Sequence, residues 1–166
     1  AAVRAAIEHE GPVYLRFGRP AVPNFTPENQ PFEIGKALLM EEGSDVTVIA
    51  TGHLVYPAVE AAYELSQKGI SAEVIDLTTI KPLDEETILR SVAKTRCVVT
   101  AEEHFMNGGM GDSICQLLAR KLPTPVEMVA VDDHFGESGK PDELMTKFGL
   151  DKPHIMKAVQ KVLGRK

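Results

Sequence analysis

The stretch Val46-Thr47-Val48-Ile49-Ala50-Thr51-Gly52-His53 joins a short apolar run to a loop that begins a helix. An uncharged, mostly β-branched run of this length is typical of a strand buried on both faces of a sheet. Beyond the loop, apolar residues recur at helical spacing from Leu54 to Leu65, and Gly69 ends this helix. The stretch therefore predicts one strand–helix unit of a parallel sheet.

The same alternation continues toward the C-terminus. Strands are expected at residues 72–77, 97–101 and 126–131, and helices are expected to begin near Asp84, Met110 and Asp151. Asp84 and Asp151 precede their helices as N-caps, because a carboxylate there accepts hydrogen bonds from the free N–H groups of the first turn. Strands that alternate with helices indicate a mostly parallel sheet with helices on both faces.

One strand precedes this series, at residues 34–40, and the turn 41–45 follows it. A connection of five residues is too short for a parallel crossover and favours an antiparallel pair with residues 46–50. The predicted fold class is α/β: a three-layer α/β/α sandwich whose five-stranded, mostly parallel sheet has one antiparallel strand.

The first 33 residues differ from this pattern. Residues 1–9 have helical spacing, residues 13–17 read as a short strand, and residues 18–33 contain four prolines that block regular structure. Because the sequence starts without Met inside a predicted helix, we expect residues 1–22 to be the trailing helix and strand of a preceding domain. Residues 23–33 would be a proline-rich linker, and residues 34–166 the main domain.

Composition excludes several classes of protein. The net charge of −6 disfavours nucleic acid and anionic membranes as partners, and no apolar stretch is long enough to span a bilayer. Cys97 and Cys115 lie in apolar stretches and are expected to be free thiols of a reducing compartment, so we expect a cytoplasmic protein.

Two loops at predicted strand ends resemble nucleotide-binding motifs only in part. The loop at residues 51–53 has one glycine of the three in a dinucleotide fingerprint, so Asp76 is a weak candidate for a ribose-binding acid. Gly139-Lys140 lacks the rest of a phosphate-binding P-loop, because His134 and Pro141 occupy the positions of the first glycine and the Ser or Thr.

A third loop carries Glu102-Glu103-His104 and the glycine-rich residues 107–112. These side chains are suited to acid–base chemistry or to a metal ion. We favour the plainer alternative, a solvated strand end and a glycine turn that enters the next helix.

Arg19 is the best-placed anion binder in the sequence. It follows the predicted strand at residues 13–17 between Gly18 and Pro20, and its forked donors match a phosphate or carboxylate. The residues alone favour the alternative of a surface arginine in a linker. Arg16 lies within the predicted strand and is expected to be structural.

Several motifs together resemble the C-terminal end of a transketolase, within the thiamine-diphosphate enzyme superfamily. They are Gly11–Pro20 (GPVYLRFGRP), Ala50–His53 (ATGH), Thr79–Asp84 (TIKPLD), Val98–His104 (VVTAEEH), Gly108–Gly111 (GGMG) and Phe135–Gly139 (FGESG). The resemblance covers essentially the whole chain, and the Phe135–Gly139 motif favours transketolase within the superfamily.

The resemblance implies an enzyme that transfers two-carbon ketol units between sugar phosphates. Thiamine diphosphate and Mg²⁺ would be bound by the remaining domains or by an N-terminal subunit. The intact enzyme is expected to be a homodimer. The resemblance also implies that Arg19 contacts the substrate phosphate, although the family commonly has Ser and Gln at the positions of Gly18 and Pro20. No catalytic, cofactor-binding or metal-binding residue is expected here, and this chain alone would be an inactive packing module. The alternatives are 1-deoxyxylulose-5-phosphate synthase and the β-subunit of a 2-oxoacid dehydrogenase.

Overall fold

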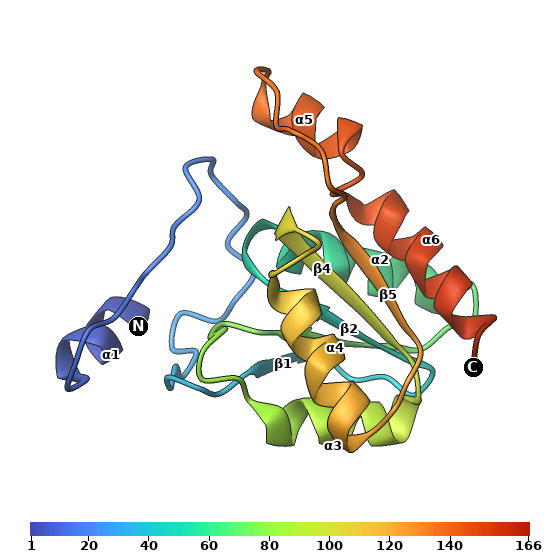
Figure 1. Cartoon of the computed structure of the whole chain (residues 1–166), viewed down its shortest axis with the longest axis horizontal. Coiled ribbons are helices and arrows are strands. Elements are labelled where there is room, and N and C mark those ends of the chain that lie inside the picture. The colour runs from blue at the N-terminus through green and yellow to red at the C-terminus, as the bar shows by residue number, and fades with distance from the viewer.

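The computed structural model describes residues 1–166 and contains one five-stranded sheet in the order β1-β3-β2-β4-β5 (Figure 1). Strand β1 is antiparallel to its neighbour, and the other neighbouring pairs are parallel. The predicted fold class is confirmed. The strands are β1 (Leu38–Glu41), β2 (Val46–Ala50), β3 (Ala72–Asp76), β4 (Val98–Phe105) and β5 (Val126–Val131).

Helices cover both faces of the sheet (Figure 1). One apolar cluster joins the sheet to α2 and α6, and a second joins the opposite face to α3 and α4. Strand β2 lies in the middle and all five of its residues are buried, as its apolar run predicts. The helices are α1 (Ala2–Glu8), α2 (Val55–Ser66), α3 (Glu85–Thr95), α4 (Met110–Lys121), α5 (Pro141–Lys147) and α6 (Lys152–Leu163), and η1 (Gly52–Leu54) is a 3₁₀ turn.

The partner of β1 differs from the prediction. The short turn after β1 suggested pairing with β2, but β1 pairs with β3, which lies between them. The turn crosses the start of β3 so closely that a Cβ atom at Gly43 would overlap the backbone of Ala72 and Glu73. Glycine there lets the chain pass over β3 and leave room for it beside β2.

Both predicted N-caps are confirmed. Asp84 accepts a hydrogen bond from the backbone N–H of Thr87, and Asp151 accepts one from that of His154, each at 3.1 Å. Helix α5 was not predicted, because its seven residues include none that is buried and so show no apolar period.

The first 34 residues lie beside the sheet rather than in it, and α1 stands apart from the layers (Figure 1). The helix predicted at residues 1–9 is confirmed as α1, but the strand predicted at residues 13–17 is wrong. Residues 12–26 make no backbone hydrogen bond. Without a neighbouring strand, a strand-like run of residues has no hydrogen-bonded ladder to join.

Two composition-based predictions concern the body of the fold. Cys97 and Cys115 are free thiols, and burial raises the pKa of each. None of the helices has the length and apolar character needed to cross a bilayer.

Candidate functional site at the carboxyl edge of the sheet

The carboxyl ends of β2 and β4 bring together two side chains that are 50 residues apart in sequence. The strands are parallel neighbours with Ala50 opposite Ala101, so the loops that follow them meet. His53 Nδ1 lies 2.8 Å from Glu103 Oε2. The His53 side chain is 18% exposed and that of Glu103 42%, so the pair is a partly buried histidine–carboxylate contact.

The turn η1 places His53 at this edge. Gly52 has φ +59°, a left-handed conformation that glycine adopts without steric cost. The Thr51 hydroxyl donates to the Leu77 carbonyl oxygen at 3.0 Å and ties the start of the turn to the end of β3. Local backbone geometry therefore holds the imidazole in place.

Glu102 points inward and caps helix α4. Its two carboxylate oxygens accept hydrogen bonds from the backbone N–H groups of Met110 and Gly111, at 2.8 and 2.7 Å. A Cβ atom at Gly109 would lie 2.6 Å from one of these oxygens, so glycine is required for the close approach. An anion at a helix N-terminus is stabilised by the free N–H groups and by the helix dipole.

This capping role corrects one expectation and confirms another. The glycine turn that enters the helix is present, but Glu102 is buried rather than solvated. His104 is exposed and its Nδ1 lies 3.1 Å from the Phe105 carbonyl oxygen, not beside either glutamate carboxylate. No group of three or more His, Cys, Asp or Glu side chains able to hold a metal ion is present in the chain.

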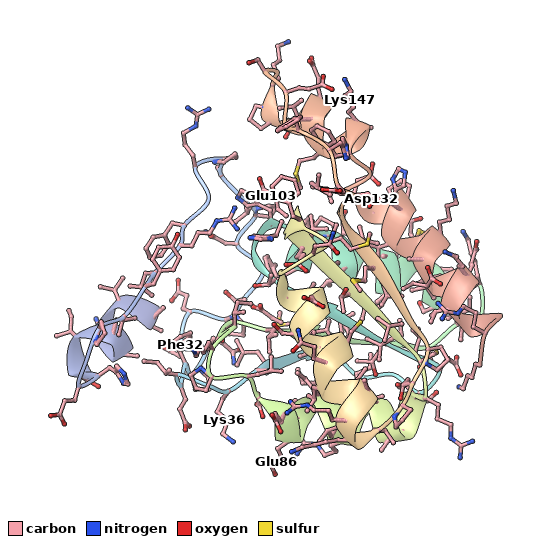
Figure 2. All side chains as sticks on the ribbon, in the orientation of Figure 1. Phe32, Lys36, Glu86, Glu103, Asp132 and Lys147 are labelled. Carbon is pink, nitrogen blue, oxygen red and sulfur yellow. The ribbon has the colours of Figure 1, made fainter.

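The N-terminal segment crosses the His53–Glu103 pair. Both terminal nitrogens of the Arg16 guanidinium donate to the Glu103 carbonyl oxygen, at 3.4 and 3.5 Å. Figure 2 shows Glu103 at the upper end of β4, on the side that faces the N-terminal segment. A Cβ atom at Gly18 would overlap the His53 ring. Arg16 thus contacts the backbone of this chain, its structural role stays a prediction, and Gly18 rests directly on the imidazole.

Arg19 follows this contact. Its side chain is exposed and has no hydrogen bond or ion pair within the chain. The guanidinium is therefore free to bind an external anion. Its role as a phosphate ligand stays a prediction.

Asp76 ends β3 at the same edge of the sheet. Its carboxyl group has no hydrogen-bond partner, and burial raises its pKa to about 6. The neighbouring loop has only one of the three glycines that a dinucleotide-binding turn needs to approach the pyrophosphate. The structure therefore adds nothing to the interpretation of Asp76 as a nucleotide ligand.

The loop that contains Gly139 and Lys140 is exposed from Asp132 to Lys140. Figure 2 shows Asp132 beyond the end of β5, and Lys147 on the helix α5 that projects from the fold. Glu137 pairs with Lys147, and Lys140 Nζ lies 3.4 Å from a Glu143 carboxylate oxygen. These charges neutralise one another at the surface rather than converge on a site.

The His53–Glu103 pair was not predicted, because each loop of the sequence was considered by itself. The signal that could have found it is topological: both residues follow strands predicted to be parallel, and parallel strands place their carboxyl ends on one edge. The order of the strands was needed to show that these two loops are neighbours.

Residues 35–155 match the family model described as "Transketolase, C-terminal domain". The chain is 45% identical over 166 residues to the 6-deoxy-6-sulfo-D-fructose transketolase subunit SqwH of Clostridium sp. (strain MSTE9), covering 100% of this chain and 52% of the relative. It is 39% identical over 157 residues to a subunit of the apulose-4-phosphate transketolase of Phocaeicola vulgatus, covering 93% and 50%. The chain thus spans about half the length of these relatives.

A further relative has a different activity in its name. The chain is 38% identical to 1-deoxy-D-xylulose-5-phosphate synthase 1 of Geobacter sulfurreducens, covering 99% of this chain and 26% of the relative. Among solved structures, the chain matches one described as "Split gene transketolase, inactive beta4 tetramer" with a TM-score of 0.95 and 43% identity, over 99% of this chain and 54% of that one. With its five-stranded mixed sheet between two layers of helices, the chain belongs to the transketolase C-terminal domain family.

Proposed function

We propose that this chain is the C-terminal part of a transketolase that transfers two-carbon ketol units between sugar phosphates. The observation that carries the proposal is the extent of the similarity to a transketolase subunit. It runs over all 166 residues and so includes the first 34, which lie outside the matched family model. The similarity therefore reaches the segment that contains Arg19.

Thiamine diphosphate with Mg²⁺ would supply the carbanion chemistry of the intact enzyme. Within this chain, no three acidic, His or Cys side chains gather into a group able to hold the Mg²⁺ ion. Other domains or an N-terminal subunit would bind the cofactor. This chain would support the assembly, and on its own it would be inactive.

We propose that residues 1–22 belong structurally to the preceding domain and that residues 23–33 are the linker. The exposure of large apolar side chains in the first segment supports this division: Ile7 is 79% exposed and Tyr14 is 87% exposed. Such side chains gain most when an adjoining surface covers them. The intact enzyme would be a cytoplasmic homodimer, with the C-terminal domain as a packing module.

Arg19 would bind the terminal anion of the substrate. Its exposed guanidinium has no partner in the chain, and the adjacent Gly18 is held against His53. A guanidinium offers two parallel donors to a phosphate, and binding energy gained there helps to orient the reacting end of the sugar. A sulfonate is the second candidate anion, because one relative is named for a sulfo-sugar.

The test is Arg19→Ala in the assembled enzyme, with a ketose phosphate, the matching sulfonate and the unmodified ketose as donors. We expect the KM for the preferred anionic donor to rise about 100-fold relative to that for the unmodified ketose, since charge-assisted hydrogen bonds are lost. The matched control is Arg90→Ala, an exposed arginine on α3. An equal rise for all three donors would contradict the anion role.

Identification of the products by mass spectrometry tests the class of reaction. A transketolase shortens the donor sugar by a two-carbon unit and lengthens the acceptor by the same unit. Formation of 1-deoxyxylulose 5-phosphate instead would favour the second candidate enzyme, which the 38% identical relative represents.

A further inference from the structure

The segment that carries Arg19 is held by few contacts. Residues 12–26 form no backbone hydrogen bond, so no ladder fixes their path. Downstream, Phe25 packs against Tyr56 with ring centroids 5.4 Å apart. Upstream, the polar contact is that of Arg16 with the Glu103 carbonyl oxygen. The position of Arg19 is therefore set by side chains of the sheet edge.

His53 is the surface on which the segment rests. Its Nδ1 is engaged by Glu103, while its Nε2 and Cε1 face Gly18, where even one methyl group would overlap the ring. The absence of a side chain at residue 18 thus allows the backbone to approach the imidazole. This contact gives a physical reason for glycine at residue 18 of this chain.

Glu103 is itself held firmly. The preceding residue, Glu102, is buried and bonded to two N–H groups at the start of α4. The pairing of β4 with β5 is irregular between Ala101 and Phe105, and there the Glu102 carboxylate reaches helix α4 while that of Glu103 reaches His53. Helix α4 therefore holds Glu102, and the next residue, Glu103, holds the His53 ring.

We propose that His53 and Glu103 are positioning residues, which hold residues 16–18 against the carboxyl edge of the sheet and thereby set where Arg19 meets the terminal anion of the substrate. The inference rests on the proposed function of Arg19 and adds the residues that aim it. Neither positioning residue touches the substrate. A displacement of the Arg19 guanidinium by about 1 Å is enough to lose much of the binding energy that it gains from the anion.

The test is a double-mutant cycle of Gly18→Ala and His53→Ala in the assembled enzyme. The readouts are the inhibition constant of inorganic phosphate and the ratio of the KM values for a ketose phosphate and the unmodified ketose. We expect each single substitution to weaken phosphate inhibition about 10-fold. The double variant should be no weaker than His53→Ala, because the added methyl group no longer meets a ring. Effects that multiply in the double variant would overturn the inference.

Matched controls separate this contact from general damage. Gly136→Ala adds a methyl group where no atom lies within 4 Å, and His154→Ala removes a histidine that pairs with Asp151 away from the segment. We expect neither to alter the phosphate inhibition constant. Glu103→Gln keeps the size of the side chain but removes its charge, so we expect a smaller shift in the same direction. A shift in the controls equal to that of His53→Ala would overturn the inference.

Arg19→Ala, measured alongside, distinguishes the two levels of the proposal. If Arg19→Ala weakens phosphate inhibition and the His53 and Gly18 variants do not, the positioning inference is wrong while the proposed role of Arg19 stands. If Arg19→Ala has no effect, both are wrong. A thermal unfolding midpoint for each variant shows that the changes in inhibition arise in a folded protein.

Discussion

The body of the fold and the N-terminal segment are built in different ways. All 40 buried residues lie at Val46 or beyond, and residues 1–34 contribute none. The body is held by two apolar clusters on either side of the sheet. The segment touches that body through Arg16, Gly18 and Phe25. Packing decides the structure of the body, whereas a few contacts decide where the segment lies.

The largest expected effect is in the centre of the sheet. Ile49→Ala should lower the free energy of unfolding by about 4 kcal/mol, because the lost burial and the remaining cavity add. Ile49 is fully buried in β2. Urea unfolding measures the loss, and the matched control is Ile7→Ala in α1, which should cost less than about 0.5 kcal/mol. Equal losses at the two positions would show that the N-terminal segment is packed as tightly as the body of the fold.

The next effect concerns the inward carboxylate at the edge of the sheet. Glu102→Ala should cost about 3 kcal/mol, since two buried N–H groups at the start of α4 lose their acceptor. Glu103→Ala should cost less than about 1 kcal/mol, because its side chain is partly solvated. Chemical denaturation compares the losses in the free energy of unfolding of the two variants. A larger loss from Glu103→Ala would contradict the role of Glu102 as the main stabilising carboxylate at this edge.

The pH dependence of stability should reveal Asp76. Burial raises the pKa of its carboxyl group from the usual 3.8 to about 6 in the folded chain. The folded state therefore favours the protonated acid, so this contribution to stability is full below the lower value and is lost as the pH rises through the upper one. The loss is about 2 kcal/mol, allowing for the part of the group that water reaches.

Urea unfolding at about pH 4 and about pH 8, for the wild type and Asp76→Asn, measures this contribution. The variant should lack the decline that Asp76 causes. The exposed Asp142 provides a matched control, and Asp142→Asn should retain the decline. If the stability of Asp76→Asn falls with rising pH as much as that of the wild type, the acid does not titrate as described.

The smallest expected effect is in the N-terminal segment. Removing residues 1–9 should change the free energy of unfolding by less than about 0.5 kcal/mol, because α1 contains no buried residue. Differential scanning calorimetry compares the two chains. A large drop in the melting temperature would mean that the body depends on α1.

The sequence predicted the body well because each strand and helix there carries its own apolar pattern. The run at residues 46–50 became the central strand, and the caps at Asp84 and Asp151 formed where expected. The same reasoning failed at residues 13–17, where a strand-like run of apolar residues has no neighbouring strand to pair with. It also paired β1 with the wrong strand, because the turn length does not show that β3 inserts between them.

The candidate site was harder to predict, since it depends on contacts between distant residues. Arg19 was singled out as a candidate from its type and its neighbours, but the contact between His53 and Glu103 depends on the order of the strands, which the sequence did not show. Nor does residue type distinguish Glu102 from Glu103, although one is a buried helix cap and the other a partly exposed partner of histidine. Strand order and pleat decide both points.

Amide hydrogen exchange tests most directly whether the N-terminal segment acquires its structure from the rest of the enzyme. In this chain alone, we expect slow exchange at residues 46–50 and fast exchange at residues 13–19, which make no backbone hydrogen bond. In the proposed assembly with the rest of the enzyme, exchange at residues 13–19 should slow by at least about 10-fold. Slow exchange at these residues in the chain alone, or fast exchange in the assembled enzyme, would contradict the proposed division of the chain.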